Sequence, residues 1–225
     1  MENVWMIFLT FLFSYLVGSI PFGLLIVHLI SGKDIRSVES GRTGGTNAMR
    51  AAGLFAGALT AGMDVFKGVV TGWIAGCLVP EILWVRVVAA LLAIMGHNYS
   101  IFLIEKHTNG KIRLRGGAGG APALGGAIAL WPPAAIYILV VGVLVFLIVG
   151  YASLTTISVA VVSIIVFTIR ALQGLSPWVY VLYGLGALII VTWALRPNLV
   201  RLRNRTERVV GLRAYLNNRR KNSVN

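Results

Sequence analysis

Acidic residues are scarce in this chain. Seven Asp and Glu residues stand against twenty Lys and Arg residues, which gives a formal net charge of +13 over 225 residues. The single cysteine, Cys77, excludes a disulfide within the chain and is expected to be a packing residue. We find no carboxylate pair, no His/Cys metal-ligand set and no nucleophile elbow in the sequence. No nucleic-acid-binding motif or interleaved aromatic pattern accompanies the basic residues, so a nucleic-acid partner is not expected.

Long apolar runs dominate what is present. Hydrophobic residues make up 57% of the chain and charged residues 12%, and about 20 apolar residues suffice to cross a bilayer. The runs predict seven spans, at about 4–30, 53–79, 81–104, 120–139, 137–152, 154–172 and 177–195. Because Trp131-Pro132-Pro133 interrupts the middle of this pattern, the fourth and fifth spans should be short or tilted. We therefore expect an all-α integral membrane protein, with a membrane domain over 1–200 and a basic tail over 201–225.

Basic residues cluster in alternate connections between these spans. They are dense in the first loop, the third loop and the tail, whereas the intervening connections carry only Arg86 and Arg170. The positive-inside rule then places the N-terminus outside and the tail in the cytoplasm, which requires an odd number of spans. The first run is too long for a signal peptide and lacks a basic leader, so it should stay in the membrane. The basic face should also attract the anionic headgroups of membrane lipids.

Two spans contain residues that are unusual inside a lipid bilayer. Gly18–Gly23, with Pro21 inside it, predicts a kink whose freed carbonyl must be satisfied by neighbouring helices. In the second span, Asp64 and Lys67 lie three positions apart on one helix face, within a stripe of small residues suited to close packing. A charge near the bilayer centre costs about 2.5–3.5 kcal/mol. We expect both side chains to face the protein interior, either as a structural ion pair or beside a substrate.

Four polar segments should meet on the cytoplasmic side. Ser40–Arg50 combines glycines, hydroxyls, an amide and two arginines, all groups that suit a phosphate, although a solvated loop is the alternative. Gly116–Gly126 enters a helix through a glycine-rich turn that also suits an anion. Tyr151–Thr156 adds hydroxyls, and the tail from Arg196 adds cations that could equally lie on headgroups. The connection 105–115, with its Asn-Gly pair, predicts a small hairpin.

The order and spacing of these motifs resemble the bacterial acyl-phosphate:glycerol-3-phosphate acyltransferases, the PlsY family, over nearly the whole chain. The matching segments are Gly18–Gly23, Gly32–Arg36, Ser40–Gly41 with Thr46–Arg50, Asp64–Gly68, Gly96–Tyr99 with Gly116, Gly117 and Gly119, Ser153–Leu154, and Asn198 with Arg201–Leu202. The resemblance implies a seven-helix protein of the bacterial plasma membrane whose active site faces the cytoplasm.

The resemblance also implies a reaction, in which a fatty acyl group passes from acyl-phosphate to the 1-hydroxyl of glycerol-3-phosphate. The products would be lysophosphatidate and phosphate, and no cofactor or metal is implied. Because acyl-phosphate is already activated, positioning and charge neutralisation can carry the chemistry. The residues expected to be catalytic are Ser40, Asn47 and Ser153. Those expected to bind phosphate are Gly41, Thr46, Arg50, His97, Arg115, Gly116, Gly117, Gly119, Asn198 and Arg201, with Asp64 and Lys67 as structural polar residues.

Three positions depart from the family pattern. The lysine of the family's G-G-K-G motif is Ala118 here, an asparagine of its first motif is Arg42, and the histidine three residues before Asn198 is Leu195. Losing a cation that holds phosphate should weaken stabilisation of the transition state. The alternative to an acyltransferase is therefore a membrane homologue that is non-catalytic or differently specific and binds phosphorylated lipid or a precursor.

The loop before the glycine-rich turn is longer than the family pattern and carries cations that could replace the lysine. Lys111, Arg113 and Arg115 share one face of a strand by alternation. Arg115 is the best candidate because it directly precedes the glycines, and Arg42 comes next. Either one of these side chains reaches the phosphate site, or the hairpin is solvated and its cations only follow the positive-inside rule.

Overall fold

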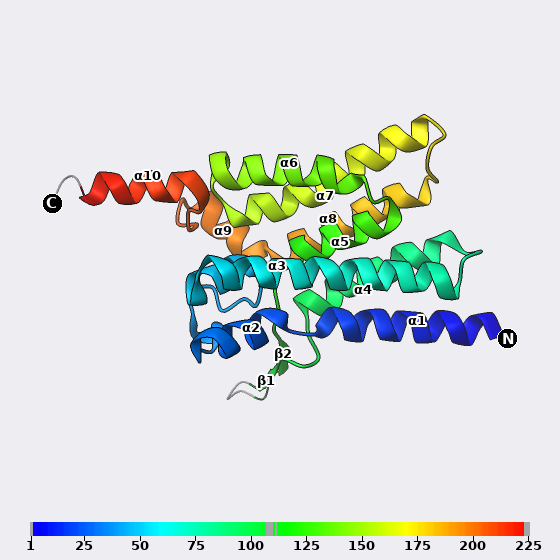
Figure 1. Ribbon diagram of the computed structural model, residues 1–225, viewed down its shortest axis with the longest axis horizontal. Helices are drawn as coiled ribbons and strands as arrows, with labels where there is room; N and C mark the ends of the chain where they lie inside the picture. The colour runs from blue at the N-terminus through cyan, green and yellow to red at the C-terminus, as the bar shows by residue number, and fades with distance from the viewer. Residues whose placement is uncertain (1, 107–109, 111, 223–225) are drawn as a thin grey trace.

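The computed structural model describes residues 2–106, 110 and 112–222. They are mainly helical, as the apolar runs predict (Figure 1). The α-helices are α1 (Glu2–Ser19), α2 (Phe22–Ser31), α3 (Gly45–Leu78), α4 (Leu83–Asn98), α5 (Gly120–Leu130), α6 (Ala134–Leu144), α7 (Ala152–Leu172), α8 (Val179–Ala194), α9 (Arg196–Arg203) and α10 (Gly211–Asn222). Two short helical turns, the 3-10 turn η1 (Ile35–Ser37) and the π-helical turn η2 (Val145–Val149), and two strands, β1 (Ile104–Lys106) and β2 (Ile112–Leu114), complete the elements.

Among the residues that the structure describes, three helical segments are long and apolar enough to cross a membrane. They are Val4–Ser31, Gly45–Leu78 and Ala152–Leu172, and α8 with α9 forms a fourth candidate that is bent by 67°. The prediction of one span over 120–139 is wrong, because the chain leaves the helix at Trp131–Pro133, where proline cannot donate a backbone hydrogen bond. The third span is also shorter than predicted, since α4 ends at Asn98.

The first span breaks where the sequence predicted a kink. α1 ends before the non-helical pair Ile20-Pro21, and α2 begins directly after it. The Ser100 hydroxyl donates a hydrogen bond to the Ser19 carbonyl at 2.5 Å, and Lys67 Nζ donates to the Ile20 carbonyl at 3.0 Å. Side chains from two other parts of the chain thus satisfy the carbonyls freed by the break, as a low-dielectric environment requires.

α3 consists of two helices joined at a sharp reversal. Gly53 has a φ of +89°, and together with Ala52 it leaves helical geometry. The segment 45–51 folds back on the helix that follows, so that a Cβ added at Gly57 would lie 2.5 Å from the Met49 Cβ. Glycine permits both the positive φ and this close approach. The membrane-crossing part therefore begins after Gly53, which agrees with the predicted span over 53–79.

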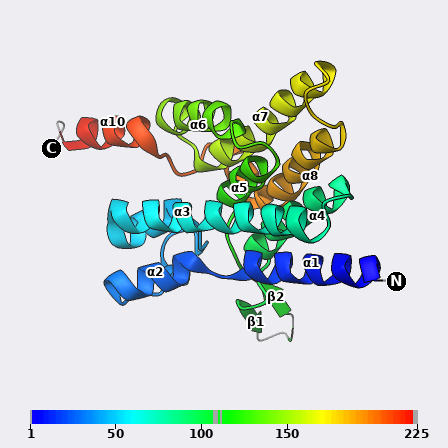
Figure 2. The same cartoon turned by 45° about the vertical axis from the view of Figure 1, so that its right-hand side comes forward.

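The small-residue stripe of α3 is the face that packs against α5. A Cβ at Gly68 would clash with the backbone of Pro122 and Gly125, and one at Gly72 would lie 2.5 Å from the Ala129 Cβ. The prediction of close helix packing along this stripe is therefore confirmed. α1, α3 and α4 also pack against one another and lie side by side in Figures 1 and 2.

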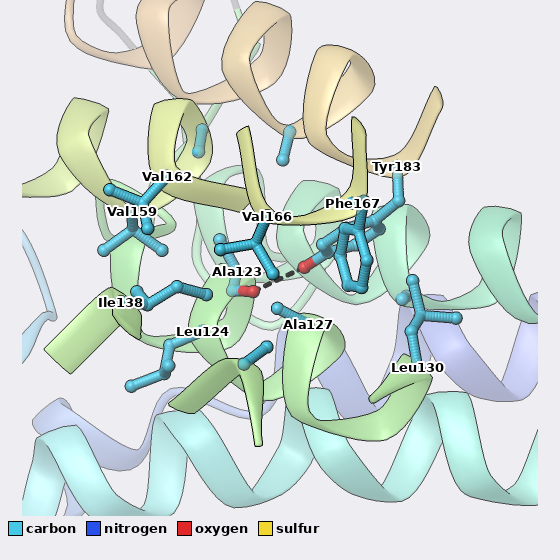
Figure 3. Close-up of a cluster of buried hydrophobic side chains, with 14 of the residues drawn as sticks. Ala123, Leu124, Ala127, Leu130, Ile138, Val159, Val162, Val166, Phe167 and Tyr183 are labelled. Carbon is cyan, nitrogen blue, oxygen red and sulfur yellow. Dashed lines mark hydrogen bonds between the residues drawn. The ribbon is translucent and has the colours of Figure 1, made fainter. Parts of the chain in front are cut away.

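The largest apolar cluster joins α4, α5, α6, α7 and α8 (Figure 3). Phe167 of α7 and Tyr183 of α8 are fully buried, and their rings meet edge to face with centroids 6.3 Å apart. The Tyr183 hydroxyl donates to the Ala123 carbonyl of α5, so the polar end of this buried ring is satisfied. The cluster holds α5 and α7 together, and both helices contribute their first residues to the cavity described below.

The predicted hairpin is confirmed, and it projects from the helical body (Figures 1 and 2). Its turn lies largely outside the described residues, and so does Lys111. At the base, Ser100 N donates to the Arg115 carbonyl at 2.9 Å, and Gly117 N donates to the His97 carbonyl at 2.8 Å. These bonds bring the glycine-rich turn back against the end of α4.

The first part of the predicted basic tail packs on the membrane domain. Val210 N donates to the Gly150 carbonyl at 2.9 Å, Tyr151 and Val209 form an isolated β-bridge, and the Val210 side chain is buried. Beyond this point α10 projects away from the bundle (Figure 1). The packed region thus extends beyond residue 200, and the first residues of α10 still contact η2 and Tyr151.

Candidate active site

One cavity of about 480 Å³ lies where the predicted polar segments meet. It is bounded by the loop before α3, by α3 to α7, by the α8–α9 junction and by the segment after α9. Its polar side chains are Ser40, Arg42, Thr46, Asn47, Arg50, Asp64, His97, Ser153, Thr155, Thr156, Asn198, Arg201, Glu207 and Arg208. Ala118 and Gly119 line it as well, so the predicted convergence of the segments around 40–50, 116–119 and 153 is confirmed except for Gly116 and Gly117.

Four of the residues predicted to bind phosphate do not line the cavity, namely Gly41, Arg115, Gly116 and Gly117. Gly117 packs against the His97 imidazole so closely that a side chain there would overlap the ring. The Arg115 Nε lies 2.6 Å from the Glu105 carboxylate, across the hairpin base. One Arg115 Nη lies 3.1 Å from where a Cβ at Gly41 would be. Arg115 therefore supports the 38–44 loop from outside the cavity.

Asn47 holds that loop from inside. Its Nδ2 donates to the carbonyls of Ile35, Val38 and Arg42 at 3.2, 3.0 and 2.9 Å. An amide carries two N–H donors, so these bonds are shared among three acceptors. The Asn47 Oδ1 is buried and has no hydrogen-bond partner among the described residues. The side chain thus fixes the loop with its nitrogen and leaves an acceptor in the cavity lining.

Arg42 spans three segments that are far apart in the sequence. Its Nη1 donates to the Gly117 carbonyl at 2.8 Å, and its Nη2 donates to the Ala194 carbonyl at 2.6 Å and to Asn198 Oδ1 at 3.2 Å. Burial, followed by the positive charge of Arg201, lowers the pKa of the Arg42 guanidinium. Arg42 ranked after Arg115 in the sequence analysis as a substitute for the missing lysine, and of these two residues only Arg42 lines the cavity.

The other cations of the cavity differ in whether a carboxylate faces them. Arg201 Nε lies 3.5 Å from Glu207 Oε2, and Arg208 Nε lies 2.8 Å from Glu39 Oε2. Arg42 and Arg50 have no carboxylate within 4.0 Å in the part of the chain that the structure describes. Two cationic side chains in a partly buried cavity without a counter-ion favour an anionic ligand.

Glu207 is a buried acid that sequence reasoning did not select. Its side chain is only 4% exposed, and Asn198 Nδ2 donates to its Oε1 at 2.8 Å. Asn198 therefore links Arg42 on one side to Glu207 on the other. The signal in the sequence was that Glu207 is an isolated acidic residue within a basic tail. We had interpreted that tail as a segment lying on lipid headgroups.

Ser153 is the buried hydroxyl of the site. The residue is 1% exposed, lines the cavity at the start of α7, and its Oγ has no hydrogen-bond partner among the described residues. Since buried polar groups normally have a partner, this hydroxyl is suited to bind a ligand atom. Ser153 was one of the residues expected to be catalytic, and the structure places it in the cavity lining.

Asp64, Lys67 and His97 form a compact buried ion cluster. Lys67 Nζ lies 2.9 Å and His97 Nδ1 lies 3.3 Å from the same Asp64 oxygen, and Asp64 and Lys67 are each 1% exposed. The prediction that both charges face the interior and find polar partners is confirmed. Asp64 and His97 border the cavity, whereas Lys67 reaches across to the break in the first span.

One wall of the cavity is apolar. α6 and η2 contribute only nonpolar residues to it, namely Ile138, Leu139, Gly142, Val143, Phe146 and Leu147. A Cβ added at Gly142 would meet no atom within 4 Å, so open space faces this glycine. The cavity therefore offers hydrogen-bonding and cationic groups together with a surface that suits a hydrocarbon chain.

Comparison with known proteins gives consistent matches over most of the chain. The family model described as "Glycerol-3-phosphate acyltransferase" matches residues 8–205. The chain is 37% identical to Glycerol-3-phosphate acyltransferase 3 of Dehalococcoides mccartyi, over 84% of this chain and 88% of that protein. It is also 37% identical to Glycerol-3-phosphate acyltransferase of Thermus thermophilus, over 91% of this chain and 96% of that one.

Solved structures match as well. The glycerol 3-phosphate form of PlsY (YgiH), described as an integral membrane glycerol 3-phosphate acyltransferase, superposes with a TM-score of 0.77 at 30% identity. The match covers 93% of this chain and 98% of that chain. The lysophosphatidic acid form of the same protein gives a TM-score of 0.75. With sequence, fold and motif order in agreement, the chain belongs to the glycerol-3-phosphate acyltransferase family.

Proposed function

We propose that this protein transfers a fatty acyl group from acyl-phosphate to glycerol-3-phosphate, giving lysophosphatidate and inorganic phosphate. The observation that carries the proposal is the composition of this cavity. In the described part of the chain, Arg42 and Arg50 have no carboxylate partner and the Ser153 hydroxyl has no hydrogen-bond partner, and these groups share the cavity with an apolar wall. Both substrates carry phosphate and one carries an acyl chain, so each part of the lining has a matching part of a substrate.

The reaction needs little from the protein beyond position and charge. The 1-hydroxyl oxygen of glycerol-3-phosphate attacks the acyl carbonyl carbon and forms the ester bond. The bond from that carbon to the bridging oxygen breaks, and phosphate leaves with the electron pair. A substrate phosphate oxygen takes the hydroxyl proton. Cationic and neutral donors that stabilise the charge on the leaving phosphate lower the barrier.

The roles we assign follow the placement of each side chain. Ser153 and Ser40 donate hydrogen bonds to substrate oxygens, and Asn47 holds the loop that carries Ser40 while its free oxygen faces the substrate. Arg50 and Arg201 bind phosphate, assisted by Thr46, Asn198, His97 and the Gly119 turn. Gly41, Gly116 and Gly117 act through close backbone packing. Asp64 and Lys67 hold α3 against the first span.

We also propose seven membrane crossings, with the N-terminus outside and the cavity facing the cytoplasm of a bacterium. The shorter apolar helices α4, α5 and α6–η2 would complete the count. The distribution of Lys and Arg supports this orientation. α1 and α10 lie at opposite ends of the long axis (Figure 1), an arrangement that supports an odd number of crossings.

The test is an assay of purified protein in lipid nanodiscs with acyl-phosphate and glycerol-3-phosphate. We expect lysophosphatidate and phosphate in equal amounts. No product from acyl-coenzyme A is expected under the same conditions, since its thioester carbonyl has no adjacent phosphoryl group for the arginines to hold. Saturable binding of glycerol-3-phosphate with no turnover by any donor would overturn the proposal and favour a binding protein.

A further inference from the structure

We propose that Arg42 binds a substrate phosphoryl group directly and supplies the positive charge that the chain lacks at position 118. The inference rests on the proposed function, because it assigns a residue of that same cavity. The ligand chemistry is a phosphate dianion, carried either by glycerol-3-phosphate or by the acyl-phosphate donor.

The location of the guanidinium is the first argument. Its Nη1 is held by the carbonyl of Gly117, the residue directly before Ala118. Its Nη2 is held by the carbonyl of Ala194, directly before Leu195, and by Asn198. The three positions at which this chain departs from the family pattern, 42, 118 and 195, therefore lie around a single charged group. The cation at position 42 therefore lies beside the position where the family has its lysine.

The second argument is the number of donors that remain. A guanidinium carries five N–H groups in a fixed planar arrangement. Among the described residues, three hydrogen bonds to three oxygens account for those of Arg42, which leaves two N–H groups without a protein acceptor. Two of the three acceptors are backbone carbonyls, so they orient the side chain without neutralising its charge.

The third argument is electrostatic. No carboxylate of the described chain lies within 4.0 Å of Arg42. Glu207, which is close by, is held instead by Asn198 and Arg201. Burial and the neighbouring charges of Arg201 and Arg113 lower the pKa of the Arg42 guanidinium. A bound phosphate would relieve both the desolvation and the repulsion, so the cavity is organised for an anion at this point.

The same geometry explains why Arg115 does not fill this role. Arg115 is paired with Glu105 and lies on the outer side of the 38–44 loop, while Arg42 lies on the inner side and lines the cavity. The longer hairpin thus places Arg115 next to the 38–44 loop. The charge that reaches the cavity is that of Arg42, which belongs to the loop itself.

A purely structural role for Arg42, as a clip between three segments, makes different predictions. The experiment compares wild type with Arg42→Gln, Arg42→Lys, Arg42→Gln/Ala118→Lys and the control Arg203→Ala. Arg203 is exposed on α9 and does not line the cavity. For each variant, the readouts are the thermal unfolding temperature, kcat, KM for each substrate, and inhibition by inorganic phosphate.

Direct binding predicts that Arg42→Gln raises KM for one substrate at least about tenfold, or lowers kcat by as much, and weakens inhibition by phosphate in parallel. Arg42→Lys should retain more of the function than Arg42→Gln, because it keeps the charge. Adding Ala118→Lys to Arg42→Gln should recover part of the loss, and Arg203→Ala should behave as wild type. The substrate whose KM rises identifies which phosphate Arg42 holds.

The inference is overturned if Arg42→Gln lowers the unfolding temperature while KM, kcat and phosphate inhibition stay at wild-type values at a lower assay temperature. It is equally overturned if Arg42→Lys and Arg42→Gln lose function to the same extent and Ala118→Lys restores none of it. Should Arg42→Gln fail to fold, the Arg42→Lys variant decides: unchanged phosphate inhibition with a lowered unfolding temperature would indicate the clip. A wild-type protein that forms no lysophosphatidate would instead refute the proposed function, which keeps the two failures apart.

Discussion

Two groups of charged side chains lie at or next to the cavity. They differ in whether other side chains of the protein neutralise their charges. Asp64, Lys67 and His97 are almost completely buried, and each lies within 3.3 Å of an oppositely charged or polar partner in the cluster. Arg42 and Arg50 are only partly buried and have no carboxylate partner in the described chain. Asp64 and Lys67 neutralise each other without a ligand, whereas Arg42 and Arg50 have no such counter-ion in the described chain.

This contrast separates a structural role from a binding role. A buried ion pair that satisfies itself holds helices together and makes no demand on a substrate. A cation that is oriented by carbonyls but lacks a counter-ion is arranged for an anion that arrives from outside. The sequence shows that both groups are charged but not which charges are paired, and four substitutions test whether the distinction holds.

The largest effect should follow from Lys67→Met. Removing the ammonium leaves Asp64 with one partner and takes a donor from the Ile20 carbonyl, so we expect a loss of about 3–5 kcal/mol in stability. The measurement is the thermal unfolding temperature in detergent, with size-exclusion elution as a check of folding. The double variant Asp64→Asn/Lys67→Met should be more stable than Lys67→Met. A single variant as stable as wild type would show that the cluster does not hold the helices.

Ser153→Ala should lower activity and leave stability unchanged, in contrast to Lys67→Met. The hydroxyl has no partner in the described chain, so its loss should leave the unfolding temperature unchanged. A hydrogen bond to a charged group contributes about 1.5–3 kcal/mol, which predicts a fall in kcat/KM of roughly 10- to 100-fold.

Ser158→Ala is the matched control for Ser153→Ala, because the Ser158 hydroxyl already donates to the Thr155 carbonyl at 2.8 Å and does not line the cavity. If both serine variants reduced turnover equally, Ser153 would have no special place in the site.

Gly142→Leu should have a smaller and selective effect. A Cβ at this position would meet no atom within 4 Å, so the new side chain would start in the open space beside the apolar wall. We expect kcat/KM for a long-chain acyl-phosphate to fall about tenfold relative to a short-chain one, since a change of a methylene or more in an apolar pocket is worth about 1–3 kcal/mol. Val140→Leu, on the exposed face of α6, is the control. An unchanged ratio of the two donors would place the acyl chain elsewhere.

The smallest effect should come from Arg115→Ala. Its partly exposed pair with Glu105 is expected to contribute no more than about 1 kcal/mol, and the side chain does not line the cavity. Turnover should therefore change less than about fivefold. A loss of tenfold or more would indicate that Arg115 supplies the missing phosphate-binding cation, as expected from the sequence.

Much of the fold follows from local rules. Apolar runs of membrane length predict helices, Pro21 predicts the break in the first span, and the Asn-Gly pair predicts the hairpin, because each depends on residues that are neighbours in the chain. The positions of Ser40, Asn47 and Ser153 in one cavity were also predicted, from the order of polar segments along alternating spans. These features need no knowledge of side-chain partners.

The pairing of charges could not be obtained in that way. Arg42 reaches acceptors 75, 152 and 156 residues away, and Arg115 is withdrawn from the cavity by Glu105 across the hairpin. Gly53 reverses the direction of the chain, so that the 45–51 segment lies against the part of α3 that follows it. Which arginine is neutralised and which faces the cavity depends on where distant carboxylates and carbonyls come to lie, and the packing of the helices in three dimensions sets those positions.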